Sequence, residues 1–324
     1  MSSFATLPPV DRRELLEAYE LRFGVSAVVA EKDFWVVWLL ARIFGAEELG
    51  MKAVFKGGTS LSKVFGAINR FSEDIDLGID PASLGWTEQE LTDSSQSHWT
   101  KHQRPDLESA CGREVEAFWL PRLEKAVSER LGEKSENRPW LRYGLEDISR
   151  SPTIYFDYPG ALTGGVSYIA RSVKLEFGSA PREFSDMGAE VIALEIERTF
   201  WEKATILHAE YHRPSEKVHP ARYARHYADF AALWRHDSKE RSAARVDLLH
   251  RVRNHKAKFF ASGWAHYHTA ELGTLRLLPA AARLDELRRD YAAMLPMFMG
   301  EPRPFDEVLE IIGEAEQSLN AMKG

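Results

Sequence analysis

Two aspartates spaced two residues apart are the first candidates for chemistry. Asp74 and Asp76 lie in "DIDLGID" (74–80), whose alternation predicts a β-strand that points both carboxylates to one face. Carboxylates at that distance repel, and a divalent cation such as Mg²⁺ would offset the repulsion while also binding substrate phosphate oxygens. An edge strand with an acidic, solvated face would show the same pattern, so the pair indicates a metal site without proving one.

Two glycines precede these acids. Gly57 and Gly58 end "AVFKGG", which predicts a short strand, and "TSLSKVFGAI" after them predicts a helix. Backbone N–H groups at such a turn and at a helix N-terminus bind phosphate. Thr59 and Ser60 add hydroxyls there, although both residue types also cap helices without any ligand. The Walker A spacing is absent, yet the order strand, glycine turn, helix, strand is typical of a mononucleotide-binding unit.

A third carboxylate is expected if two metal ions assist phosphoryl transfer. The segment "SVKLEFGS" offers Glu176 on a predicted strand, with Lys174 two residues earlier on the same face. A Lys–Glu pair on a solvated strand is the alternative interpretation.

Lys203 falls in the middle of an apolar helix face that includes Ile196, Phe200 and Leu207. A buried ammonium is costly unless it is paired. The side chain therefore either reaches out to solvent between helices or enters a cleft where it meets phosphates.

Asp229 lies four residues after Arg225 on a predicted helix. The spacing allows an ordinary ion pair on a solvated face. The functional alternative places Asp229 near the reacting groups, where it orients Lys203 or accepts a proton.

The segment 222–258 is locally basic. It holds ten Lys and Arg against four Asp and Glu, within a chain of net charge −7. Such an excess is the best candidate for a surface that faces RNA, and Phe259 and Phe260 could stack on unpaired bases. An ordinary basic helix face with buried Phe side chains is the alternative.

Composition limits the classes of protein. The 324 residues are 44% hydrophobic and 28% charged, which is typical of a soluble globular protein, and the net charge excludes a surface that is basic throughout. The single cysteine, Cys111, excludes an internal disulfide and a cysteine-based zinc site. No signal peptide is evident, and the apolar run 34–44 is too short to span a bilayer. We therefore expect a cytoplasmic protein that does not contact a membrane.

The periodicity along the chain predicts an α+β fold: a lobe with a small mixed sheet, then a C-terminal helical lobe. We expect the first lobe, with its N-terminal helices, over 1–185 and the helical lobe over 186–324. Within them we predict helices across 11–50, a loop over 81–113, a helix over 113–131, and an almost wholly helical chain from about 190. We also predict two strands, "SPTIYFDYP" and "SYIARSVKLEFGS", joined by a hairpin at "GALTGG".

The segment "FKGGTSLSKVF…NRFSEDIDL" resembles the first motif of the polymerase-β-type nucleotidyltransferases. More narrowly, the chain resembles the AbiEii/AbiGii toxin family of bacterial toxin–antitoxin and phage-defence systems. The likeness extends to "EKDFWV" before this motif and to "KLEF", "ERTFWEKATIL", "RHYADF" and "RRDYAAMLPMF" after it. In one departure, Arg225-His226 stands where the family carries an Arg-Asp pair.

The resemblance implies a Mg²⁺-dependent transferase, with Mn²⁺ as a possible substitute, that uses a nucleoside triphosphate. It implies that the first lobe is a nucleotidyltransferase lobe in which Asp74 and Asp76 bind the metal and Gly57, Gly58, Thr59 and Ser60 hold the triphosphate. It also implies that Lys203 and Asp229 are catalytic. From the two-metal argument we add Glu176 as the third catalytic and metal-binding carboxylate. We assign Lys63, Arg70 and Lys174 to nucleotide binding as well. The implied acceptor is RNA, at the tRNA acceptor end, and the implied partner is a separately encoded antitoxin.

Two other functions stay open at this point. Nucleotidylation of a protein would suit the acidic net charge better than transfer to RNA. A catalytically idle nucleotide sensor would bind a nucleotide and a partner without transfer, although all three carboxylates of the expected site are present. We find no compact helix-turn-helix that would indicate a DNA-binding module.

Overall fold

The chain forms two compact units, which we describe separately. The first unit comprises Met1–Val64 and Phe71–Leu194, and the second comprises Phe65–Arg70 and Glu195–Gly324. The units divide after Leu194 and not near residue 185, where the sequence predicts the boundary, because two further strands join the sheet before the helices begin. The computed structural model describes residues 2–50, 52–87, 90–91, 99–134, 138–146, 149–162, 170–179, 185–188 and 191–322.

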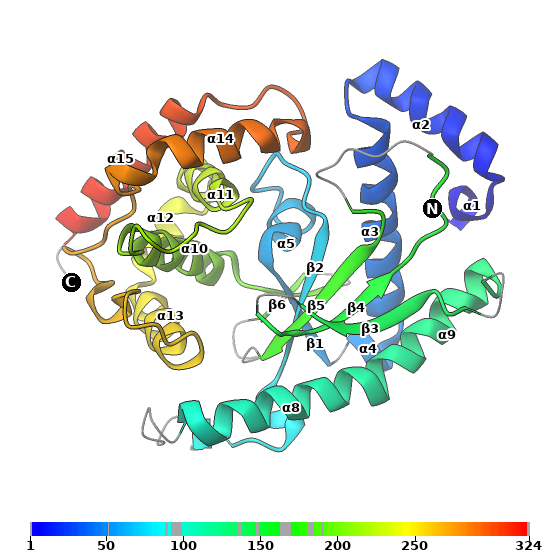
Figure 1. Ribbon diagram of the computed structural model, residues 1–324, viewed down its shortest axis with the longest axis horizontal. Helices are drawn as coiled ribbons and strands as arrows, with labels where there is room; N and C mark the ends of the chain where they lie inside the picture. The colour runs from blue at the N-terminus through cyan, green and yellow to red at the C-terminus, as the bar shows by residue number, and fades with distance from the viewer. Residues whose placement is uncertain are drawn as a thin grey trace. The chain divides into compact units, whose positions relative to one another are not determined.

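A mixed sheet organises the first unit (Figure 1), which confirms the predicted α+β class. Among the described residues its strands follow the order β3-β4-β5-β2-β1-β7-β6. The pairs β2–β5 and β1–β7 are parallel, and the other neighbours are antiparallel. The strands are β1 (Ala53–Lys56), β2 (Asp74–Ile79), β3 (Leu141–Leu145), β4 (Pro152–Phe156), β5 (Val173–Ser179), β6 (Ser185–Gly188) and β7 (Val191–Leu194).

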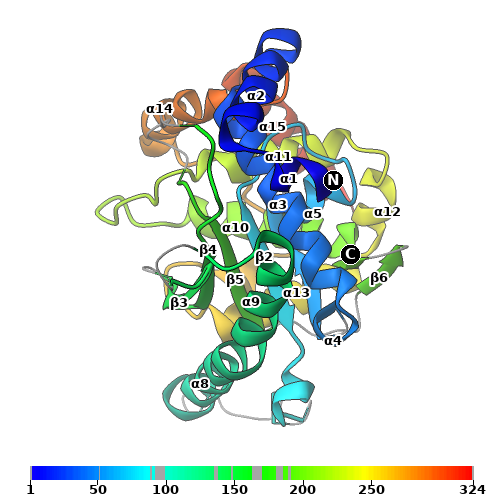
Figure 2. The same cartoon turned by 90° about the vertical axis from the view of Figure 1, so that its right-hand side faces the viewer.

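Helices cover the sheet of the first unit. One long rod is built from α8 and α9, joined by a π-helical segment over Val115–Trp119, and Figure 2 shows this rod from a second side. A 3₁₀ turn spans Pro81–Leu84, and a π-helical turn spans Trp99–Gln103. The helices are α1 (Ser2–Thr6), α2 (Pro9–Phe23), α3 (Ala27–Gly45), α4 (Glu47–Gly50), α5 (Gly57–Lys63), α8 (Arg104–Glu114) and α9 (Leu120–Leu131).

The core of the first unit lies between α3 and one face of the sheet. Trp35 and Trp38 of α3 are buried, and they belong to the same apolar cluster as Ile75 and Leu77 of β2. Because side chains alternate along a strand, burial of these two β2 residues directs Asp74 and Asp76 to the opposite face. The hydrophobic pattern of β2 therefore decides where its carboxylates point.

Helices make up most of the second unit, as predicted for the chain beyond about 190. Residues 65–70 belong to it, because Arg70 forms a β-bridge with Phe298 and the Met299 N–H donates to the Asn69 carbonyl at 3.1 Å. Its helices are α10 (Ile196–Tyr211), α11 (Ala224–Arg235), α12 (Lys239–Ala244), α13 (Val246–Phe259), α14 (Leu284–Met294) and α15 (Phe305–Ala321), with 3₁₀ turns at Tyr267–Thr269, Ala281–Arg283 and Leu295–Met297.

Three local predictions differ from the structure. The predicted loop 81–113 contains α8, because Leu107 and Cys111 are buried four residues apart and form a helical face that the surrounding polar residues obscure. Helix α5 ends at Lys63 rather than continuing to residue 68. Residues 191–194 form β7 instead of a helix.

The predicted hairpin at "GALTGG" is confirmed in its pairing, since β4 and β5 are antiparallel neighbours, but residues 163–169 lie outside the described part of the chain. Across the described residues, no helix is long and apolar enough to cross a membrane.

Candidate active site

Three predicted site carboxylates lie side by side on the face of the sheet that is turned away from α3. The parallel register pairs Asp74 with Lys174 and Asp76 with Glu176. Paired residues of neighbouring strands point to the same face, so β2 and β5 together present all four side chains on one surface. About a quarter of each of the Asp74 and Glu176 side chains is exposed. The tertiary structure thus brings together residues that are about 100 positions apart in sequence.

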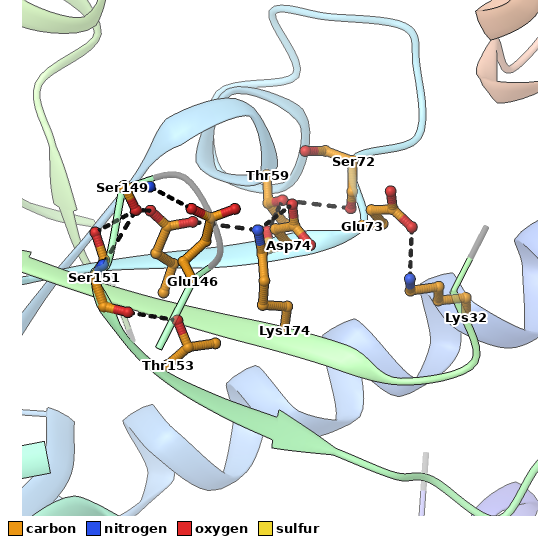
Figure 3. A network of polar contacts seen from close by, with 11 residues as sticks. Lys32, Thr59, Ser72, Glu73, Asp74, Glu146, Ser149, Ser151, Thr153 and Lys174 are labelled. Carbon is orange, nitrogen blue, oxygen red and sulfur yellow. Dashed lines mark hydrogen bonds and ion pairs between the residues drawn. The ribbon is translucent and has the colours of Figure 1, made fainter. Parts of the chain in front are cut away.

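Lys174 lies between two of these carboxylates. Its Nζ is 3.5 Å from Asp74 Oδ2 and 3.3 Å from Glu176 Oε2, and Figure 3 shows the side chain reaching towards Asp74. Burial by itself would lower the pKa of Lys174, but the carboxylates of Asp74 and Glu176 outweigh it and raise that pKa above its usual value. The ammonium therefore stays charged and partly neutralises the acidic face.

Gly57 brings the backbone against the Asp76 carboxylate. Its φ of +79° lies in the left-handed region, which favours glycine. A Cβ added at Gly57 would collide with the Asp76 carboxylate, lying 2.8 Å from its Cγ. The glycine turn and the second aspartate consequently form one packed arrangement, and a side chain at 57 would displace the carboxylate.

The hydroxyls of Thr59 and Ser60 both donate hydrogen bonds to backbone carbonyls of the protein. Thr59 is buried, and its Oγ1 donates to the Asp74 carbonyl and, at 3.4 Å, to the Ser72 carbonyl (Figure 3). The Ser60 Oγ donates to the Gly57 carbonyl at 2.9 Å, and this residue is buried too. These contacts fix α5 against the start of β2, so a role of either hydroxyl in nucleotide binding stays a prediction.

Two predicted nucleotide ligands, Lys63 and Arg70, form ion pairs with aspartates outside β2 and β5. Lys63, at the end of α5, donates to Asp33 of α3 at 2.6 Å. Arg70 belongs to the second unit, where it pairs with Asp229. Lys174, the third residue assigned to the nucleotide by its charge, contacts the carboxylates of Asp74 and Glu176.

Our sequence interpretation missed three further polar residues of this face. Lys56 pairs in register with Asp76, and alternation with the buried Phe55 could have indicated its direction. At the turn between β3 and β4, the Ser149 Oγ donates to Glu176 Oε1 at 3.3 Å, and the Ser149 N–H donates to Glu146 Oε2 at 2.6 Å. No local pattern marks Ser149 or Glu146, because only the pairing of β3, β4 and β5 brings their turn to Glu176.

The oxygen donors suit Mg²⁺. Among the described residues, no three His, Cys, Asp or Glu side chains are arranged as they stand to hold a metal ion. Mg²⁺ usually takes only one or two protein carboxylates and completes its coordination with water and substrate phosphates. Asp74 and Asp76, on one face and partly exposed, meet that requirement. Glu176 as a third metal ligand stays a prediction.

The second unit holds a buried cluster around Asp229. Arg70 donates to both carboxylate oxygens, from Nε at 2.7 Å and from Nη2 at 2.8 Å, and Lys203 Nζ donates at 2.7 Å. Asp229 is fully buried and Lys203 is 7% exposed. Two alternatives from the sequence are therefore excluded. Asp229 does not form an ion pair with Arg225 on a solvated face, and Lys203 does not reach out to solvent.

Charge governs the titration of this cluster. Burial alone would raise the pKa of Asp229, but Arg70 and Lys203 hold it well below its usual value. His226 Nδ1 lies 3.2 Å from Lys203 Nζ, and burial together with the Lys203 charge lowers the pKa of His226 well below the ordinary range. The cluster thus contains an ionised aspartate and a neutral histidine at neutral pH. Catalytic roles for Lys203 and Asp229 stay predictions.

The basic segment 222–258 is partly neutralised. Arg235 pairs with Glu314 at 2.7 Å, and Arg241 and Arg253 pair with Glu197 and Glu271. At the end of α13, however, the His255 ring stacks on Phe259 with centroids 4.3 Å apart, Lys256 Nζ lies 4.8 Å from the Phe260 ring, and Phe260 is 51% exposed. The exposed ring of Phe260, with Lys256 beside it, is therefore the part of the predicted surface that best fits binding of a nucleic-acid base.

The chain was compared with family models, with curated proteins and with solved structures. A family model described as nucleotidyl transferase AbiEii toxin, type IV TA system, matches residues 38–311. A search of curated proteins finds no match. Among solved structures, JHP933 from Helicobacter pylori is 15% identical with a TM-score of 0.37, covering 92% of this chain and 98% of its own. A second H. pylori protein, assigned as a nucleotidyltransferase, is 15% identical with a TM-score of 0.36, covering 90% and 97%.

At TM-scores this low, neither likeness carries a conclusion for this chain. The family model, by contrast, covers most of its length, including both strands that carry the carboxylates. The chain belongs to the AbiEii nucleotidyl transferase toxin family of type IV toxin–antitoxin systems.

Proposed function

We propose that this protein is a Mg²⁺-dependent nucleotidyltransferase that moves a nucleotide from a nucleoside triphosphate to RNA, at the acceptor end of tRNA. The observation that carries the proposal is the joint placement of Asp74, Asp76 and Glu176 on one face of β2 and β5, with Gly57 packed against Asp76. The family supports nucleotidyl transfer, and this arrangement supports where it takes place.

The metal would be held by Asp74 and Asp76 together with phosphate oxygens of the nucleotide. A bound Mg²⁺ supplies charge neutralisation at the transferring phosphate and orients the substrate. Lys174, which already contacts Asp74 and Glu176, adds a fixed positive charge to the same face. Most of the rate enhancement then comes from positioning and electrostatic stabilisation.

Glu176 would act on the acceptor side. In the reaction, the acceptor hydroxyl oxygen forms a bond to the α-phosphorus, the bond to the leaving pyrophosphate breaks, and the hydroxyl proton passes to a base. Glu176 Oε1 accepts a hydrogen bond from the Ser149 hydroxyl at 3.3 Å, so this carboxylate is already placed to accept from a hydroxyl group.

Support for RNA as the acceptor comes from the end of α13. Phe260 is half exposed next to Lys256, and an exposed aromatic ring beside a cation offers a platform for an unpaired base. A separately encoded antitoxin as a protein partner follows from the family's type IV toxin–antitoxin description.

The experiment that tests the proposal is incubation of the purified protein with each of the four α-labelled nucleoside triphosphates, Mg²⁺, total bacterial RNA and lysate protein. A parallel reaction contains the Asp76→Asn variant. We expect label on RNA of tRNA size, with one nucleotide preferred, and none with the variant. Omission of Mg²⁺ should abolish the label, and Mn²⁺ should restore it.

Two other outcomes would replace the proposal. Label on protein instead of RNA would establish protein nucleotidylation, which the net charge of −7 favours because an acidic surface repels nucleic acid. Nucleotide binding without label on any acceptor would make the protein a catalytically idle sensor.

A further inference from the structure

Three consecutive charged residues, Glu31, Lys32 and Asp33, interrupt the otherwise apolar start of α3. Each contacts a different segment of the first unit, although all three lie within one helical turn. Two of the three segments adjoin Asp74, and α3 also packs under the strand that carries it. The contacts are Glu31 Oε1 with the Ala161 N–H at 2.5 Å, Lys32 Nζ with Glu73 Oε2 at 2.6 Å, and Asp33 Oδ2 with Lys63 Nζ at 2.6 Å.

The Lys32–Glu73 pair is the most deeply buried of these contacts. The side chain of Lys32 is 1% exposed and that of Glu73 is 4% exposed. Removing two charges from water costs free energy that their attraction only partly repays, and apolar side chains of similar size often stabilise a fold equally well. A buried pair of this kind can hold two segments in one arrangement without adding to stability.

Glu73 directly precedes Asp74 at the start of β2. Figure 3 shows Glu73 turned towards Lys32 and Asp74 turned towards Lys174, as alternation along a strand requires. A slip of β2 by one residue would exchange its two faces and turn Asp74 and Asp76 towards the apolar core. The same slip would separate Glu73 from Lys32, leaving a buried ammonium without this carboxylate.

The start of β2 is also connected to α3 through α5. Thr59 of α5 donates to the carbonyls of Ser72 and Asp74, and Lys63 at the end of α5 is bound by Asp33 of α3. Helix α3 therefore holds the start of β2 directly through Lys32 and indirectly through α5. Both attachments end at residues 72–74, that is, at Asp74 or within two residues of it.

We infer that Lys32 and Glu73 are positioning residues for nucleotidyl transfer, which set the register and place of Asp74 without touching the reacting atoms. This inference rests on the proposed function, in which Asp74 holds the metal. It assigns a role to the "EKDFWV" segment, whose charged residues take no part in the catalytic face. An apolar replacement of the pair should then preserve the fold and impair the site.

The test is the double variant Lys32→Met/Glu73→Leu. We expect cooperative unfolding at a temperature within a few degrees of wild type, a kcat lowered about 10- to 100-fold, and Mn²⁺ binding, followed by electron paramagnetic resonance, weakened several-fold. A merely structural pair would leave both kcat and Mn²⁺ affinity unchanged in a folded variant. That result, or a double variant that fails to fold, would overturn the inference.

Two further variants sharpen the test. Glu73→Asp keeps the charge but shortens the side chain, so it should fold and still lower kcat, and wild-type kcat in this variant would contradict the assignment. Lys52→Met/Glu114→Leu removes a pair of the same unit, 2.8 Å apart and about a third exposed, that links the residue before β1 to the end of α8. Its kcat should equal that of wild type. If the wild-type protein transfers no nucleotide, the proposed function is wrong. If wild type is active and the variants of the pair are equally active, the inference alone is wrong.

Discussion

Asp76 and Glu176 lie beside each other because β2 and β5 run parallel in a register that pairs these two residues. On the other side of β2, the antiparallel register sets Lys56 beside Asp76. The central carboxylate of the face thus has an acid on one neighbouring strand and a lysine on the other. This placement makes Asp76 the residue whose charge should matter most.

Removal of the Asp76 charge should abolish transfer and leave folding intact. Asp76→Asn keeps the size and partial exposure of the side chain but removes a proposed metal ligand worth several kcal/mol of charge stabilisation, so kcat/KM should fall at least about 100-fold. Circular dichroism and thermal unfolding should match wild type. Asp80→Asn, at the end of the same segment, is the control and should retain activity. Full activity of Asp76→Asn would rule out the metal assignment.

A methyl group at Gly57 should damage both stability and activity. Gly57→Ala adds a Cβ that collides with the Asp76 carboxylate, in addition to the left-handed φ penalty of about 1–2 kcal/mol. Gly24→Ala is the matched control, since Gly24 has a φ of +69° and nothing within 4 Å of an added Cβ. Urea denaturation should show a larger loss for Gly57→Ala, and only that variant should lose transfer activity. Equal effects of the two variants would refute the packing argument.

Neutralising Asp229 should destabilise the second unit. Asp229→Asn leaves the buried Arg70 and Lys203 without their shared carboxylate, and breaking a buried ion pair costs about 3–5 kcal/mol. Glu314→Gln removes the exposed partner of Arg235 and should cost less than about 1 kcal/mol. Both values are measured by urea denaturation. A loss for Asp229→Asn as small as that for the control would show that the cluster adds no stability.

Acidification should destabilise the protein partly through His208. Burial and the neighbouring His212 lower the pKa of His208 to about 4 from its usual 6.5. As pH falls, the unfolded chain binds a proton at His208 near pH 6.5, whereas the folded protein binds it only near pH 4. Between these two pH values protonation favours the unfolded chain, so the free energy of unfolding is highest above pH 6.5 and declines as pH falls towards 4. The loss is about 1.4 kcal/mol per pH unit. Urea denaturation at pH 7.5, 6 and 5 should show a smaller decline for His208→Gln, with His250→Gln, an exposed position on α13, as the control.

Loss of the Phe260 ring should weaken RNA use specifically. Base stacking on an aromatic side chain contributes about 1–3 kcal/mol, so Phe260→Ala should raise the KM for RNA roughly 5- to 150-fold without changing the KM for the nucleotide. Phe23→Ala is the matched control, because Phe23 is 56% exposed and Arg22 lies 5.1 Å from its ring. An unchanged KM for RNA in Phe260→Ala would remove the end of α13 from the proposed acceptor surface.

Local periodicity was enough to predict some of the elements that carry the site. Alternation in 74–79 predicted β2 and the shared face of Asp74 and Asp76, and the apolar face around Lys203 predicted α10. Both patterns repeat within a few residues, so they can be read without knowing what packs against them. The same reasoning failed for α8, where only two buried positions mark the helix.

The contacts between charged residues could not be predicted from local patterns, because they depend on long-range packing. Arg70 and Asp229 are 159 positions apart, and Lys32 and Glu73 are 41 apart. Neither pair has a sequence pattern, because a buried charge finds its partner through strand register and helix packing rather than through local spacing. Lys174 likewise reads as an ordinary strand lysine until β5 pairs with β2 and places its ammonium between two carboxylates. The types of residue in the site were therefore fixed locally, and their contacts were fixed by long-range packing.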